Sequence, residues 1–114
     1  MKAWSSALAA EVSEWPKLSA KSFFGFTALR RGETIFGALP RTRAFSTPNS
    51  LAFKLQTVSV AQQKRLQSDP RVGIMRRGNS RWFTFEMSSD SDLHDVLDWL
   101  LRAYQAAGKA KKTR

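Results

Sequence analysis

The chain has 114 residues, a formal net charge of +10 and no cysteine. This length suits one domain with a single hydrophobic core, which we place at residues 1–108, and an apolar content of 42% argues against disorder. The absence of cysteine excludes disulfides and thiolate chemistry and fits a reducing cytoplasm, the location that we expect.

The first predicted element is a helix over residues 3–15, which Pro16 ends. Its apolar residues recur at spacings of four, four and three: Trp4, Leu8, Val12 and Trp15. Glu11 and Glu14 interrupt the stretch where a signal peptide needs its apolar core, and no run reaches the roughly 18 apolar residues of a membrane span. We therefore expect neither export nor a membrane partner.

Three strands are predicted next, near residues 22–29, 33–39 and 51–55. The first two flank Arg30-Arg31-Gly32-Glu33, and a glycine in so short a link is typical of a hairpin. In the third, Leu51, Phe53 and Leu55 alternate with more polar residues, which indicates one buried face.

The second half of the chain predicts a helix, a strand pair and a closing helix. Ser59 is positioned to cap a helix over residues 57–67, and the segments RVGIM and RWFTFEM form the strands. Ser89 caps the last helix, which Gly108 ends, and residues 109–114 form a basic disordered tail. The apolar stripe of this helix consists of Leu93, Val96, Leu97, Leu100 and Tyr104.

The predicted order is therefore α-β-β-β-α-β-β-α. Runs of hairpin-linked strands between helices favour an α+β fold with helices packed on an antiparallel sheet, in a single domain. A doubly wound parallel sheet would instead alternate strands and helices.

Several segments resemble a known group of small bacterial domains. They are WPKLSAKSFFGFTALRRGETIFGAL, SLAFKL, SDPRVGIM, RWFTFEM and DLHDVLDWLLRAYQAA, spanning about residues 15–105. Together they look like YjbR-like proteins and the N-terminal domain of the TfoX competence regulators, at superfamily level. A fainter likeness connects the aromatic strand and last helix to domains labelled luciferase-like.

The resemblance implies an α+β fold of the secretion-chaperone type. TfoX proteins are associated with switching on competence genes, but the second, helical module of those proteins has no counterpart in this chain. We therefore do not expect this chain to act as a transcription regulator.

Charge is distributed unevenly along the chain. Residues 16–82 contain thirteen Lys or Arg against two acids, a net of +11, whereas residues 83–108 have a net charge of −4. Such asymmetry predicts a positive surface that attracts polyanions over about 10 Å at ordinary ionic strength.

The residues that we expect to contact an anion lie mostly in predicted links between strands, where guanidinium groups offer forked donors to phosphate oxygens. Lys54 and Trp82 are added because an aromatic and a basic side chain on an open sheet face are suited to stacking on bases. Two other interpretations fit the same pattern: arginines in turns are simply solvated, and helices cover Trp82. The candidate residues are Arg30, Arg31, Arg41, Arg43, Lys54, Arg77, Arg81 and Trp82.

The sequence contains no positive signal for an enzyme. It has no nucleophile elbow and no phosphate-binding glycine loop, and its one histidine, His94, is predicted to flank the apolar stripe of the last helix, at the surface or at the edge of the core. Asp90, Asp92 and Asp95 lack the glycine turn and the distal glutamate of a calcium loop and suit the positive end of a helix dipole, so we expect no metal and no cofactor.

Two functions of different classes remain. One is a non-enzymatic module that binds nucleic acid or another polyanion through a basic face. The other is a protein-interaction module, with an acidic protein or a second copy of the chain as its partner. A small-molecule enzyme is a third, weaker alternative.

Overall fold

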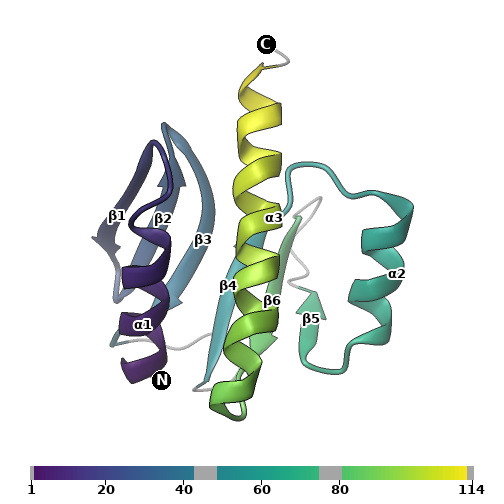
Figure 1. Cartoon of the computed structure of the whole chain (residues 1–114), viewed down its shortest axis with the longest axis horizontal. Helices are drawn as coiled ribbons and strands as arrows, with labels where there is room; N and C mark the ends of the chain where they lie inside the picture. Colours follow the sequence, from purple (N-terminus) through teal and green to yellow (C-terminus); the bar gives the residue numbers. More distant parts are fainter. Residues whose placement is uncertain (1, 43–48, 75–80, 113–114) are drawn as a thin grey trace.

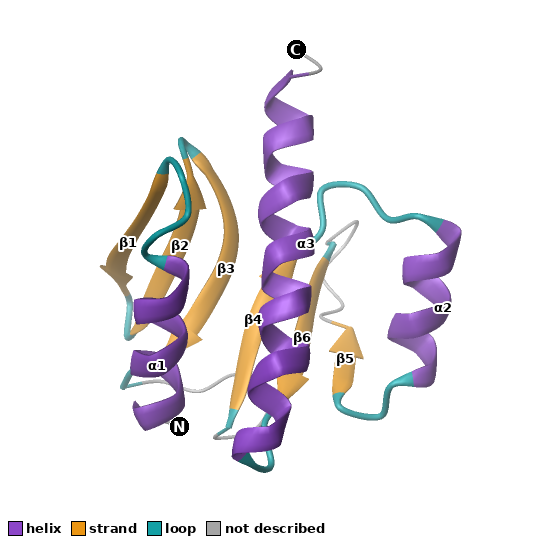
Figure 2. Cartoon of the chain, viewed as in Figure 1, coloured by secondary structure: helices purple, strands orange, loops and turns teal. Residues whose placement is uncertain are grey.

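The computed structural model describes residues 2–42, 49–74 and 81–112. Three helices lie against one face of a six-stranded antiparallel sheet (Figures 1 and 2). In chain order the elements are α1 (Lys2–Val12), β1 (Leu18–Phe23), β2 (Phe26–Arg31), β3 (Thr34–Pro40), β4 (Ser50–Lys54), α2 (Val60–Ser68), β5 (Val72–Ile74), β6 (Trp82–Glu86), the 3-10 turn η1 (Asp90–Asp92) and α3 (Leu93–Lys112).

The sheet has the strand order β1-β2-β3-β4-β6-β5, with every neighbouring pair antiparallel. This confirms the predicted α+β class and antiparallel sheet. The structure contains one strand more than predicted, because the segment expected as a single strand at 22–29 turns at Phe24-Gly25. Both turn residues have positive φ, 47° and 86°, as in the two-residue turns that suit the twist of a hairpin.

The core lies between the sheet and α3. On β4 and β6, Leu51, Phe53 and Phe85 are fully buried toward the helices, as the alternation predicts. The ring of Trp99 in α3 stacks on Phe53 with centroids 5.5 Å apart. Trp99 is 1% exposed whereas Leu97 is only half-buried, so the buried stripe of α3 is centred nearer Trp99 than predicted.

Helix α1 ends at Val12, three residues before the predicted end. Trp15 nevertheless reaches the core from the following turn, where its amide donates to the Val12 carbonyl at 2.9 Å. Its ring packs against Phe36 and Tyr104, with centroids 6.4 and 5.0 Å away. The apolar spacing thus marked the correct core residues but overestimated the helix.

Helix α2 begins with the cap predicted at Ser59. The Ser59 hydroxyl accepts a hydrogen bond from the Gln62 amide, and the Gln62 side chain accepts one from the Ser59 amide, both at 3.1 Å. This reciprocal capping box satisfies two amides that a helix start otherwise leaves unpaired.

The prediction that Gly108 ends the last helix is wrong, because α3 continues to Lys112. Gly108 has a packing role instead: a Cβ added there would lie 2.3 Å from Nη1 of Arg31. The Arg31 guanidinium lies over the Tyr104 ring, 4.3 Å from its centroid, and donates to the Tyr104 carbonyl at 3.2 Å. Glycine at 108 therefore leaves room for an arginine from β2.

Among the described residues, no helix combines the length and apolar character needed to cross a bilayer.

Candidate nucleic-acid interface

The sheet has two different faces. The three helices occupy one of them (Figure 2), and no described helix covers the other. Strand alternation and the pairing register assign side chains to this second face, which we call the open face. Its residues include Ser19, Lys21, Phe23, Phe26, Ala28, Arg30, Ile35, Ala38, Ala52, Lys54, Trp82, Thr84 and Glu86.

The middle of the open face is a row of small side chains. The register pairs Ala28 with Ala38, Ala38 with Ala52 and Ala52 with Thr84. Ala28 and Ala52 are buried, so the accessible part of this face consists of the larger side chains around them.

Three candidate residues share the open face at one end of the sheet. Lys54 pairs directly with Trp82, and Arg30 pairs with Ile35, which lies at the same end of the neighbouring strand β3. Lys21 of β1, paired with Ala28, adds a further cation to this face. None of the three cations forms a salt bridge with another described residue.

Two more candidates lie at this end of the sheet but face the helices. Arg31 follows Arg30 in the strand and so points to the opposite side, onto Tyr104. Arg81 directly precedes Trp82, so it points to the side opposite Trp82, and its guanidinium donates to the Gln56 carbonyl. The adjacent arginines 30 and 31 therefore do not form one site, because successive strand residues alternate in direction.

Arg41 lies at the other end of the sheet. It follows β3, and its guanidinium donates to the Ser22 hydroxyl of β1. The structure therefore does not bring Arg41 together with Arg30, Lys54 and Trp82. Arg43 and Arg77 lie outside the described residues.

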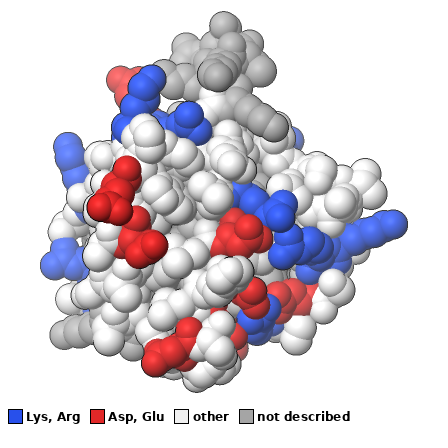
Figure 3. All heavy atoms as spheres, viewed as in Figure 1, with Lys and Arg blue, Asp and Glu red and all other residues white. Residues whose placement is uncertain are grey.

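Four acids on the helix side, Asp69, Asp92, Asp95 and Asp98, form ion pairs with arginines of that side. Arg71 pairs with Asp69 and Asp92, each at 2.8 Å, and with Asp95 at 3.1 Å. Asp98 is paired in turn with Arg65 and Arg102, at 3.5 and 3.0 Å. Figure 3 shows this face, with Asp and Glu side chains close to Lys and Arg.

These contacts shift the pKa values of the acids. Hydrogen bonds from Arg71 lower the pKa of Asp69, and those from the backbone amide of Ser88 and from Arg71 lower the pKa of Asp92. The same carboxylates raise the pKa of Arg71. Asp92 and Asp95 thus hold the start of α3 rather than presenting free oxygen ligands.

Two aromatic residues of the open face were not among the candidates. Phe23 and Phe26 pair with each other at the end opposite Trp82, and Phe23 is 49% exposed. Sequence alternation placed them inside one continuous strand, so their position on this face depends on the hairpin that the sequence did not reveal. The open face therefore carries aromatic side chains at both ends, with Arg30 and Lys54 at the end of Trp82 and Lys21 nearer the middle.

Among the described residues, no group of three or more His, Cys, Asp or Glu side chains is arranged to hold a metal ion. Comparison with known proteins finds no matching family model, no similar curated protein and no similar solved structure.

Proposed function

We propose that the protein binds single-stranded nucleic acid on the open face of its sheet. The observation that supports this most directly is the position of Arg30 and Lys54 at the same end of that face as Trp82, with no carboxylate partner among the described residues. Cations that track a phosphate backbone and aromatic rings that stack on bases are the two components of such sites.

A single strand suits this surface better than a duplex. Its unpaired bases expose their flat faces to aromatic side chains, and a broad sheet face enters neither groove of a duplex. Base stacking is also tolerant of sequence, so the proposed binding has little base preference. The proposal also draws on the resemblance to YjbR-like and TfoX N-terminal domains, since TfoX proteins are associated with switching on competence genes.

The test measures fluorescence anisotropy of a labelled 15-nucleotide oligo-dT, with oligo-rU and a duplex of equal length as comparisons. Lys54→Ala removes a cation beside Trp82, and Lys64→Ala is the matched control, because Lys64 is an exposed lysine on α2. We expect Lys54→Ala to weaken single-strand binding several-fold and Lys64→Ala to leave it nearly unchanged. With three cations engaged, the salt dependence should have a slope of about −2.

Trp82→Leu tests stacking separately. Leucine keeps apolar bulk at this half-buried position, and the loss of one stacked base should weaken binding by about 5- to 150-fold. Circular dichroism checks that the fold is retained. Absence of single-strand binding at low salt, or equal losses in Lys54→Ala and Lys64→Ala, would refute the proposal.

A second candidate function has one specific observation in its favour. Strand β1 forms an edge of the sheet, and Phe23 and Phe24 are 49% and 76% exposed at its end. An unpaired edge beside exposed aromatic groups suits pairing with a second copy of the chain. Sedimentation velocity over a hundredfold range of concentration checks it, since a dimer that Phe24→Asn weakens is expected and a monomer throughout excludes it.

A further inference from the structure

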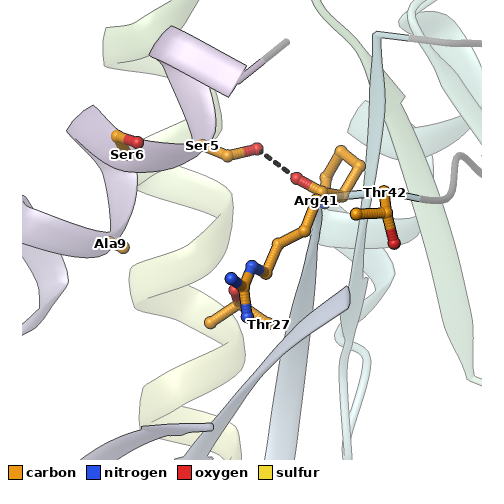
Figure 4. A pocket seen from close by; sticks show the side chains of 7 residues that line it. Ser5, Ser6, Ala9, Thr27, Arg41 and Thr42 are labelled. Carbon is orange, nitrogen blue, oxygen red and sulfur yellow. Dashed lines mark hydrogen bonds between the residues drawn. The ribbon is translucent and has the colours of Figure 1, made fainter. Parts of the chain in front are cut away.

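A polar pocket lies on the helix side of the sheet, at the end away from Arg30 and Lys54. It has a volume of about 330 Å³. Helix α1, strand β2, the end of β3 and the two residues that follow β3 line it (Figure 4). Neither the open face nor its residues contribute to it, so it is independent of the proposed nucleic-acid interface.

Small side chains on α1 leave the space. Ser5 and Ala9 are one helical turn apart and both line the pocket, whereas Leu8 and Val12 of the same helix are buried in the core. The Ser5 hydroxyl donates to the Pro40 carbonyl at 2.8 Å, which joins α1 to the end of β3.

Arg41 supplies the only charge among the described residues that line the pocket. In Figure 4 its side chain extends between α1 and the sheet toward Thr27. The guanidinium donates to Ser22, a neutral partner, and forms no salt bridge with a described residue. Of its five N–H donors, those not used by Ser22 are available to a ligand.

The backbone beneath this arginine is fixed. The amides of Arg41 and Thr42 both donate to the Gly25 carbonyl, each at 3.0 Å. Arg41 is therefore anchored to the β1–β2 turn through its main chain and to Ser22 through its side chain. Such anchoring reduces the entropy that the arginine loses on binding a ligand.

Three hydroxyls accompany the guanidinium. Ser6, Thr27 and Thr42 line the pocket from α1, from β2 and from the chain after β3. No hydrogen bond joins their hydroxyls to another described side chain or backbone group. They can donate to a ligand oxygen from different directions, which suits a tetrahedral group with several acceptor oxygens better than a planar one.

We propose that this pocket binds a small phosphorylated molecule through its phosphate group. The forked guanidinium of Arg41 takes two phosphate oxygens, and the hydroxyls of Ser6, Thr27 and Thr42 donate to the others. The volume is at the lower end of the range for small-molecule sites, so the rest of the ligand is small. No described lining residue carries a carboxylate that would repel an anion.

The experiment follows backbone amide shifts of the ¹⁵N-labelled full chain during titration with inorganic phosphate, glycerol phosphate and acetate. We expect saturable shifts at Ser5, Ser6, Thr27 and Thr42 with both phosphates and much weaker shifts with acetate. Arg41→Gln should weaken phosphate binding at least about tenfold, and Thr27→Val should weaken it less. Equal binding of acetate would replace the phosphate assignment by a general carboxylate site and so overturn it.

Arg30→Gln is the matched control, because Arg30 lies on the open face. It should leave phosphate shifts in the pocket unchanged while weakening oligo-dT binding, and Arg41→Gln should do the reverse. The phosphate titration therefore tests the pocket proposal, and oligo-dT binding separately tests the nucleic-acid proposal. Phosphate shifts that spread over exposed arginines and survive in Arg41→Gln would show unspecific charge attraction and overturn the pocket proposal.

Discussion

At the scale of single residues, Gly37 and Gly108 each leave space that a Cβ would fill, but the groups that occupy this space differ. Gly37 lies where β3 passes under α3, and a Cβ there would be 3.2 Å from Leu100 and 3.3 Å from Leu29. Gly108 makes room for Arg31, whose flexible end can move away. The first contact is between fully buried groups and the second is with a half-buried side chain.

This difference predicts opposite tolerance at the two positions. Gly37→Val should lower the free energy of unfolding by about 1–3 kcal/mol, because the close-packed leucines cannot yield. Gly108→Ala should change it by less than about 1 kcal/mol, because the gain in helix propensity offsets the displaced arginine. Urea denaturation of both variants measures this, and a Gly108→Ala loss as large as that of Gly37→Val would contradict it.

At the scale of elements, the β1–β2 hairpin explains why sequence analysis predicted one strand too few. Phe24 adopts φ 47°, a conformation that costs a residue with a Cβ about 1–2 kcal/mol. An aromatic residue at that position predicts a strand, whereas Asn or Gly would have revealed the turn. The sequence of β1 gives little indication of a strand, since its last four residues are all exposed and show no alternation of buried and exposed side chains.

Replacing Phe24 should therefore stabilise the hairpin. Phe24→Asn should raise the free energy of unfolding by about 0.5–1 kcal/mol, because Asn tolerates positive φ and the exposed ring contributes little beyond its contact with Phe23. Phe23→Asn, a change in regular strand, should give no such gain. Thermal unfolding of the two variants compares them, and equal effects would rule out backbone strain as the cause.

At the scale of the whole molecule, the ion pairs around Arg71 join the start of β5 to the start of α3. Asp92 is 12% exposed and accepts from the Ser88 amide at 2.8 Å as well as from Arg71. Because its pKa is lower in the folded state than in the unfolded chain, it stabilises the fold above an unfolded pKa of about 3.9. That contribution disappears as the pH falls through the folded-state pKa.

Asp92→Asn tests this linkage. At pH 7 the variant should be less stable than the parent chain by about 1.5–3 kcal/mol, the usual range for hydrogen bonds to a charged group. Once the pH is low enough to protonate the parent carboxyl in the folded state, the two proteins should unfold at similar denaturant concentrations. A difference of the same size at both pH values would assign the loss to packing and not to charge.

The sequence predicted which residue types form the candidate site, but it predicted only part of their positions in space. Lys54 and Trp82 could be paired from strand alternation, and the register places them side by side. Arg30 and Arg31 were expected together, yet alternation sends one to the open face and the other onto α3. The sequence did not show that Arg41 lies far from Arg30 and Lys54. That separation depends on the end of the sheet at which β3 terminates, which only the strand pairing defines.

The sequence by itself determined the fold class, most helix and strand positions, the cap at Ser59 and the basic character of the middle of the chain. These features follow from local periodicity and composition, which depend only on residues that are close together in the sequence. Tertiary structure decided which face each cation occupies and which acids neutralise which arginines. Those outcomes depend on long-range pairing, on the register irregularity between Leu29 and Arg30, and on the packing of α3 across the sheet.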